Sequence, residues 1–253
     1  MMMKPALAFR QPDFPCSWQA LPCGNEIKAE IDRQLAPWWP KFFGYHLAKI
    51  GCLSGQLISD TSSIKHQFTI AQTAEQGDIV AEIDDLPLLE HSVDVCVLSH
   101  VLEFSLDPHH VIREANRILI PNGYIVITGF NPLSLAGINK LIPYRRKQTP
   151  WQERFFSPMR IKDWLHLMGF EVLADQRCLH SSLASSKHAA FVGRYWQKFA
   201  NKYLPSLGSI YIIIAKKRVL PLTPIKPKWR LKPSFSPVNV STSMSSNKNK
   251  SHN

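Results

Sequence analysis

Residues 79–130 carry a regular succession of apolar and polar positions. Nearly continuous apolar runs at 79–82, 93–99 and 124–128 predict buried strands, and the first of them ends in a carboxylate. Between the last two runs, Asp107-Pro108 predicts the start of a helix. That helix carries apolar residues at helical spacing on one face: Val111, Ile112, Ala115, Ile118 and Leu119. Strands that alternate with helices in this way are typical of a parallel α/β sheet.

The same patterns extend to both sides of this block. They predict further strands at residues 46–50, 66–71, 170–173 and 209–215, and further helices at 26–35, 133–141 and 158–168. Ser157 as N-cap, Pro158 at the first helical position and Gly169 after the last turn delimit the last of these helices. No clear helix separates the last two strands, which indicates an antiparallel hairpin at one edge. The fold class predicted is α/β: a doubly wound, mostly parallel sheet with an antiparallel edge hairpin.

Composition divides the chain into three predicted segments. Residues 1–43 form an N-terminal extension rich in Pro and aromatic residues, with one helix and a Trp- and Phe-rich cluster at 38–43 that we expect to pack in the core. Residues 44–218 form the α/β domain. Residues 219–253 form a basic tail rich in Pro and Ser, for which the composition predicts disorder from about residue 234.

The net charge of +11 comes from the C-terminal part of the chain. No acidic residue follows Asp175, whereas fourteen Lys and Arg residues do, so residues 1–175 hold sixteen basic and nineteen acidic residues and a net charge of −3. A basic segment of this kind can meet nucleic acid, an anionic surface or an acidic partner, or it can simply solubilise the chain.

Nothing in the sequence predicts export or a membrane span. The N-terminal residues 1–13 contain no apolar core of a secretory signal, and no apolar run approaches the roughly 20 residues of a transmembrane helix. The five cysteines are odd in number and widely spaced, with no paired spacing for a metal site or a disulfide framework. We therefore expect reduced thiols, no bound metal and a cytoplasmic location.

Ligands of open parallel sheets bind beyond the carboxyl ends of the strands. In this chain those ends carry Glu82, Ser99 and Gly129, each directly at the close of an apolar run. A strand-end carboxylate such as Glu82 can accept hydrogen bonds from ribose hydroxyls or an exocyclic amine, although it can also be an ordinary solvated group. These three positions are where we expect function to reside.

The sequence resembles the class I S-adenosylmethionine-dependent methyltransferases. The resemblance rests on Glu82-Ile83-Asp84-Asp85-Leu86-Pro87, on Ser99-His100-Val101-Leu102-Glu103 and on the segment from Arg113 to Gly123, which occur in the order and at the spacing of that family. It covers about residues 44–175 and the last strand. It implies a seven-stranded Rossmann-like methyltransferase sheet, S-adenosylmethionine as cofactor and methyl transfer to an acceptor that the sequence does not reveal.

The resemblance also implies roles for individual residues. Gly51 and Gly55 match the glycine motif after the first strand, where Lys49 stands in place of the usual acid and Leu53 in place of the middle glycine. The roles implied are adenine contact for Glu82 and Ile83, and contact with the methionine part of the cofactor for Ser99. The expected ribose-binding acid after the second strand has only Glu75 and Asp78 as candidates.

His100 and Glu103 are the candidates for acid–base catalysis. An activated sulfonium needs an enzyme mainly for orientation and, with a poor nucleophile, for a base. His100 lies one residue beyond Ser99, and Glu103 three residues further on can orient it. A histidine here can equally be a structural residue. We expect Asp94 to cap a strand entry without a functional contact.

Three functions remain open at this point. The first, to which the sequence analysis commits, is a methyltransferase with an unknown acceptor. The second is a catalytically inactive methyltransferase-like binding protein, suggested by Lys49 and Leu53. The third is an RNA- or anionic-surface-binding protein that uses the basic tail, where Trp229 lies among Lys and Arg residues at 216–232. The oligomeric state cannot be predicted from the sequence.

Overall fold

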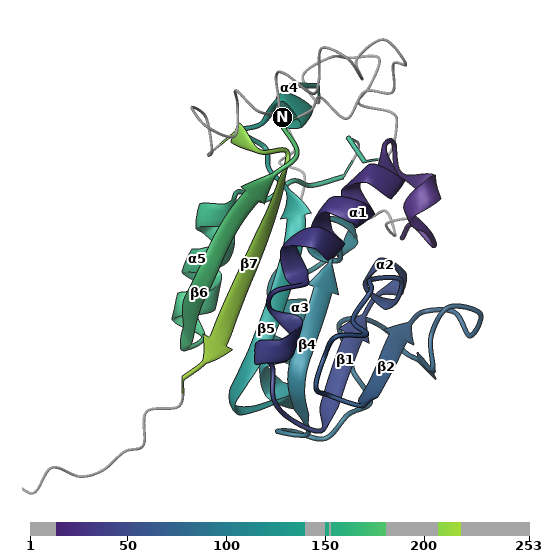
Figure 1. Ribbon diagram of the computed structural model, residues 1–253, viewed down its shortest axis with the longest axis vertical. Coiled ribbons are helices and arrows are strands. Elements are labelled where there is room, and N and C mark those ends of the chain that lie inside the picture. Colours follow the sequence, from purple (N-terminus) through teal and green to yellow (C-terminus); the bar gives the residue numbers. More distant parts are fainter. Residues whose placement is uncertain (1–13, 140–149, 152, 181–206, 219–253) are drawn as a thin grey trace, which may run out of the picture. The chain divides into compact units, whose positions relative to one another are not determined.

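A computed structural model describes residues 14–139, 150–151, 153–180 and 207–218. Seven strands make up its sheet (Figure 1): β1 (His46–Ile50), β2 (His66–Ala71), β3 (Ile79–Val80), β4 (Val93–Ser99), β5 (Leu119–Phe130), β6 (Phe170–Cys178) and β7 (Ile210–Lys217). The α-helices are α1 (Gly24–Leu35), α2 (Cys52–Gly55), α3 (Pro108–Ile118), α4 (Leu135–Asn139) and α5 (Pro158–Leu167). Single 3-10 turns are η1 (Trp18–Ala20), η2 (Trp39–Lys41) and η3 (Leu102–Phe104).

The strands lie in the order β3-β2-β1-β4-β5-β7-β6. Neighbours from β3 to β5 pair in parallel, whereas β7 runs antiparallel to both β5 and β6. The fold class predicted from the sequence is therefore confirmed, including the antiparallel hairpin at one edge. Because β7 runs antiparallel to β5, the start of β7 lies beside the end of β5, with Tyr211 in register with Gly129.

Three strands differ in length from the prediction. β5 (predicted at 124–128) begins at Leu119, which therefore belongs to this strand and not to the helix α3 that ends at Ile118. The strand predicted at residues 79–82 is limited to β3, because β2 ends at Ala71 and offers only two register partners. A turn follows at once, closed by a hydrogen bond from the Asp85 N–H to the Glu82 carbonyl. At the opposite edge β6 extends to Cys178, because β7 pairs with it along its whole length.

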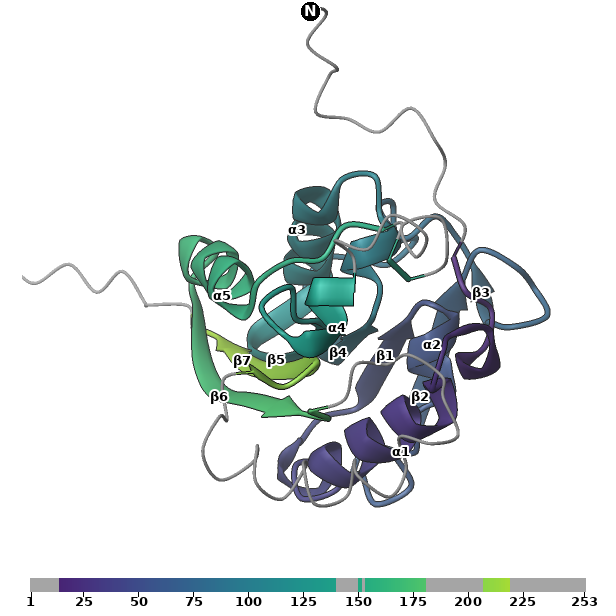
Figure 2. The same cartoon turned by 90° about the horizontal axis from the view of Figure 1, so that it is seen from above.

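Helices cover both faces of the sheet (Figure 2). On one face, α3 and α5 bury their apolar residues against alternate residues of β1, β4 and β5, with Ile112 and Leu165 among those without any exposed surface. On the other face α1 packs with the aromatic residues of the 38–43 cluster, and Trp39 and Phe42 are buried there. The prediction that this cluster packs in the core is confirmed for Trp39 and Phe42, whereas Phe43 is exposed.

Local caps fix where the elements start. The Asp94 carboxylate accepts hydrogen bonds of 2.8 Å from both the Tyr45 and the His46 N–H groups, so it caps the entry to β1 as predicted. Asp107 accepts from the His110 N–H at the start of α3, and Ser157 accepts from the Arg160 N–H at the start of α5. These satisfied helix ends hold the elements that frame the carboxyl edge of the sheet.

Several predicted features lie outside the described residues. They are the start of the N-terminal extension at 1–13, the end of the helix predicted at 133–141, most of the connection between β6 and β7, and the basic tail at 219–253. Within the described ranges, no helix is long and apolar enough to cross a membrane.

Candidate functional site

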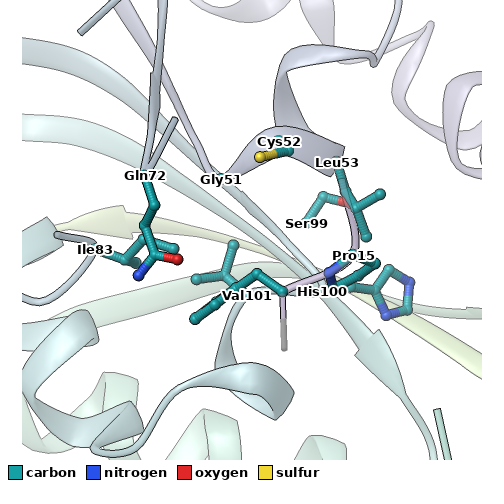
Figure 3. A pocket seen from close by; sticks show the side chains of 10 residues that line it. Pro15, Gly51, Cys52, Leu53, Gln72, Ile83, Ser99, His100 and Val101 are labelled. Carbon is teal, nitrogen blue, oxygen red and sulfur yellow. The ribbon is translucent and has the colours of Figure 1, made fainter. Parts of the chain in front are cut away.

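A cavity opens at the carboxyl ends of β1, β2 and β4 (Figure 3). Four of the residues predicted for the site line it: Gly51, Ile83, Ser99 and His100. They come from the ends of three strands, β1, β3 and β4, and meet at the edge of the sheet where a parallel fold binds its ligand. The other predicted residues, Gly55, Glu82 and Glu103, do not line the cavity themselves.

The turn after β1 brings the backbone close to the cavity. Gly51 has φ +85° and ψ 151°, a backbone conformation that residues other than glycine rarely adopt. Its N–H donates to the Ile70 carbonyl at 2.8 Å. A β-carbon at Gly51 would lie 2.9 Å from Val101 Cγ2, inside the cavity wall. At Gly55 a β-carbon would instead lie 2.7 Å from Thr69 Cγ2, so this glycine allows α2 to pack on β2.

The two departures from the family's glycine motif have different consequences. Leu53 is buried and forms part of the cavity wall, so its side chain narrows the space that a glycine would leave. Lys49 does not line the cavity, because its ammonium group donates to the Leu57 carbonyl at 2.9 Å. Burial lowers the pKa of Lys49, and the nearby carboxylates of Asp60 and Asp32 oppose that shift.

Gln72 supplies a polar group that the sequence analysis missed. It follows β2 directly, lines the cavity beside Ile83, and donates from Nε2 to Glu82 Oε2 at 2.9 Å (Figure 3). Glu82 is exposed, so it reaches the cavity edge through Gln72. The position after the second predicted strand was the available clue, but a search restricted to carboxylates overlooks an amide.

Neither sequence candidate for the acid after the second strand meets the cavity. Asp78 bridges back to β2, where its carboxylate accepts from the Thr69 N–H at 2.7 Å. Glu75 is exposed on the same connection. Gln72 is the residue that the structure places at the end of β2.

Ser99 is held by hydrogen bonds to α2 and to β5. Its N–H donates to Ser54 Oγ at 2.8 Å, and its hydroxyl lies 2.8 Å from Thr128 Oγ1, where either oxygen can donate. The first bond ties the end of β4 to α2 and the second ties it to β5. Ser99 is thus a fixed wall of the cavity.

His100 adopts a strained backbone conformation, with φ +51°. Its N–H continues the sheet by donating to the Thr128 carbonyl at 3.0 Å, while its ring is buried against Trp18 and Phe130 at centroid distances of 5.6 and 4.2 Å. Imidazole Nδ1 lies 3.5 Å from Glu103 Oε1, and both side chains are fully buried. The structure therefore brings the two predicted acid–base residues together.

Glu103 and Tyr211 adjoin each other behind His100. Glu103 Oε1 accepts from the Phe130 N–H at 2.7 Å. Burial, and after it the Glu103 carboxylate, hold the pKa of Tyr211 well above its usual value. Tyr211 was missed at the sequence level because it lies within the apolar run that predicts β7.

An N-terminal segment, residues 14–18, closes the cavity. Phe14 and Pro15 line it, and Trp18 donates from Nε1 to the Leu53 carbonyl at 3.1 Å. Gln56 on α2 fastens the segment by donating from Nε2 to the Cys16 carbonyl at 2.9 Å. The space that remains is about 20 Å³, room for about one water molecule.

Comparison with known sequences places the chain among methyltransferase domains. A family model described as "Methyltransferase domain" matches residues 49–127. The chain is 39% identical over 221 residues to a protein of Escherichia coli (strain K12) described as "Uncharacterized protein YafS", and the match covers 87% of this chain and 88% of that protein.

Solved structures share the fold. A SAM-dependent methyltransferase from Archaeoglobus fulgidus matches with a TM-score of 0.54 at 20% identity, over 75% of this chain and 94% of the other. A structure from Thermotoga maritima, described as a possible histamine N-methyltransferase, matches with a TM-score of 0.53 at 19% identity, over 79% and 100%. The chain belongs to the same family as YafS, its residues 49–127 match the methyltransferase domain, and it shares the fold of these S-adenosylmethionine-dependent methyltransferases.

Proposed function

We propose that this protein is an S-adenosylmethionine-dependent methyltransferase. The observation that carries the proposal is the cavity at the carboxyl ends of β1, β2 and β4, which Gly51, Gln72, Ile83, Ser99 and His100 line together. Gly51 allows such a cofactor to approach the backbone closely, and the Gln72 amide suits its ribose. The apolar side chain of Ile83 suits its adenine, and we assign the His100 imidazole to its sulfonium end.

Each residue has a distinct task in this proposal. Gly51 leaves the backbone of the β1–α2 turn accessible, because it carries no side chain there. Gln72, held by Glu82, presents amide groups to ribose hydroxyls, and Ile83 packs against the flat base. Ser99 forms the wall near the methionine end.

When bound, the cofactor supplies a methyl group already activated on a sulfonium. What the chain must add is orientation of the acceptor and a place for its proton. His100 lines the cavity, and its two ring nitrogens have no hydrogen-bond partner among the described residues. Glu103, with Oε1 3.5 Å from Nδ1, stabilises the imidazolium that forms when His100 takes up that proton.

The N-terminal segment has to move before a ligand of nucleoside size enters. The remaining space of about 20 Å³ is far smaller than such a ligand, and Phe14 and Pro15 are the side chains that occupy the mouth. Three hydrogen bonds fasten this segment to α2 and to Gln56 directly after it: from Trp18 Nε1 to the Leu53 carbonyl, from the Trp18 N–H to Gln56 Oε1, and from Gln56 Nε2 to the Cys16 carbonyl. Opening therefore breaks few bonds.

Calorimetric titration with S-adenosylmethionine and S-adenosylhomocysteine tests the proposal. We expect micromolar dissociation constants, about −8 kcal/mol of binding free energy. Gln72→Ala should weaken binding by about 1–2 kcal/mol and Glu82→Ala by up to that amount, because each removes part of one hydrogen-bonded pair. Glu75→Ala, an exposed carboxylate on the same connection, is the matched control and should leave affinity unchanged.

Failure of binding has a definite meaning. If the folded protein binds neither compound, the methyltransferase assignment is refuted, and the closed cavity with Leu53 in its wall would favour an inactive methyltransferase-like binding protein. Equal losses in Glu75→Ala and Gln72→Ala would refute the residue assignment alone.

A further inference from the structure

Three fully buried side chains beside the cavity carry polar atoms without hydrogen-bond partners. Among the described residues, both ring nitrogens of His100, Glu103 Oε2 and Tyr211 Oη have none. Burying such a group unpaired costs free energy, and a carboxylate costs the most. Four such atoms in one place indicate a site whose partner comes from outside the described residues, and a bound ligand is one such partner.

The three side chains converge from separate elements on one point of the sheet edge. His100 follows β4, Glu103 lies on η3, and Tyr211 lies at the start of β7, opposite Gly129 at the end of β5. A β-carbon at Gly129 would collide with Tyr211 Oη and lie 2.6 Å from Glu103 Oε1. The missing side chain of Gly129 therefore leaves the room in which Tyr211 Oη and Glu103 Oε1 lie close together.

The charge of this cluster is uncompensated. Within the described part of the chain, the only ion-pair partner of Glu103 is His100, at 3.5 Å, and no Lys or Arg pairs with it. The neighbouring surfaces are aromatic: the Phe130 ring lies 4.2 Å from that of His100, and Phe155 stacks on Phe130 at 5.1 Å. A carboxylate set among aromatic rings is chemistry that favours a cation, through charge pairing and through attraction to ring faces.

We propose that His100, Glu103 and Tyr211 form the binding site for the amino group of the methyl acceptor, so that the substrate class is an amine. This inference rests on the proposed methyltransferase function. An ammonium group that enters donates to Glu103 Oε2 and Tyr211 Oη, which both lack a donor.

The proton balance follows from the same three groups. The bound ammonium gives one proton to a free ring nitrogen of His100, and the electron pair of that N–H bond stays on the amine nitrogen as the lone pair that attacks the methyl carbon. The nitrogen becomes positively charged again as the methyl group arrives, while the C–S electron pair remains on sulfur. Glu103 is placed to stabilise that developing positive charge.

An alcohol or an acid suits the cluster less well. A neutral hydroxyl can donate to Glu103 Oε2 and accept from the Tyr211 hydroxyl, but unlike an ammonium group it brings no positive charge to the buried carboxylate. A carboxylate acceptor would meet a buried like charge at Glu103, whose other oxygen is already held by the Phe130 N–H.

The first experiment measures thermal unfolding without any ligand. Tyr211→Phe and Glu103→Gln should each raise Tm, because each removes an unpaired buried polar or charged group, and Gln retains an oxygen for the Phe130 N–H. Tyr45→Phe, at an exposed tyrosine, is the matched control and should not shift Tm. An unchanged or lower Tm in both cluster variants means that the cluster is structural, and overturns the proposal.

The second experiment uses three probes with one skeleton: 2-phenylethylamine, 2-phenylethanol and phenylacetate, each at 10 mM with saturating S-adenosylhomocysteine. Only the amine should raise Tm of the wild-type protein, and Glu103→Gln should abolish that shift. A shift with the alcohol or the acid, no shift with the amine, or an equal amine shift in Glu103→Gln overturns the inference. The titration with S-adenosylhomocysteine alone reports separately on the proposed function.

Discussion

The change Gly51→Ala tests both the turn after β1 and the cavity that it borders. Gly51 adopts φ +85° and ψ 151°, a region that is essentially restricted to glycine, and strain of this kind costs of order 1–3 kcal/mol. The new methyl group would also lie 2.9 Å from Val101 Cγ2, which adds about 1 kcal/mol of crowding. We therefore expect Gly51→Ala to lower the free energy of unfolding by about 2–4 kcal/mol.

The chain provides controls for the two contributions. Gly169 also has a positive φ, +82°, but a β-carbon there would meet only the Arg218 carbonyl at 3.5 Å, an ordinary contact distance. Gly169→Ala therefore reports strain without crowding and lies after α5, away from the cavity. Val101→Ala in the Gly51→Ala background should recover the crowding contribution of about 1 kcal/mol and leave the strain.

Two assays separate stability from binding. Urea titration gives the free energies of unfolding, and calorimetry with S-adenosylhomocysteine gives affinity. Gly51→Ala should lose measurable binding, because its methyl group occupies a cavity of about 20 Å³, whereas Gly169→Ala should bind like the wild type. A destabilisation below about 0.5 kcal/mol, or unchanged affinity in Gly51→Ala, would contradict the account of this turn.

Three further changes test neighbouring contacts. Trp18→Phe removes the donor to the Leu53 carbonyl and should lower the free energy of unfolding by about 0.5–1.5 kcal/mol while it speeds ligand association in stopped-flow measurements. The hydrogen bond from Arg117 lowers the pKa of Glu114. This bond therefore contributes to the free energy of unfolding above about pH 4.3, and the contribution is lost as pH falls through the lowered pKa. Arg117→Gln should make the free energy of unfolding less dependent on pH in the acid range. Urea midpoints at pH 7 and pH 3 check this. Burial lowers the pKa of Lys49, so the free energy of unfolding of the wild-type protein rises with pH from that lowered pKa up to about pH 10.4. Lys49→Met should remove this rise, as urea midpoints at pH 8 and pH 10 would show.

The fold was predictable because its strands and caps are local features. The runs at 93–99 and 209–215 are almost entirely apolar, as a strand covered on both faces requires, and β4 and β7 each have a neighbouring strand on both sides. Ser157, Pro158 and Gly169 delimit α5 through bonds to nearby residues. Only strand lengths escaped prediction, because β3 and β6 end where their partners end.

The sequence predicted those site residues whose type and position at a strand end indicate a chemical role. His100, Ser99 and Gly51 stand at strand ends with a recognisable chemistry, and the structure places all three on one cavity. Gln72 escaped notice because an amide took the position where a carboxylate was expected. Tyr211 escaped notice because β7 is apolar on both sides of it, and only the antiparallel pairing of β7 with β5 brings its hydroxyl to Glu103.

Polar groups at this edge of the sheet are of two kinds, and the difference predicts opposite effects of similar substitutions. The Ser99 hydroxyl is paired with Thr128 Oγ1 at 2.8 Å, so Ser99→Ala leaves a buried oxygen without its partner and should lower the free energy of unfolding by about 1–3 kcal/mol. Tyr211 Oη is buried but has no partner among the described residues, so Tyr211→Phe removes a penalty and should raise it. Urea unfolding of the two variants side by side measures both signs. If both changes destabilise the protein, the polar groups at this edge of the sheet are all structural. The proposal that His100, Glu103 and Tyr211 bind the methyl acceptor is then refuted.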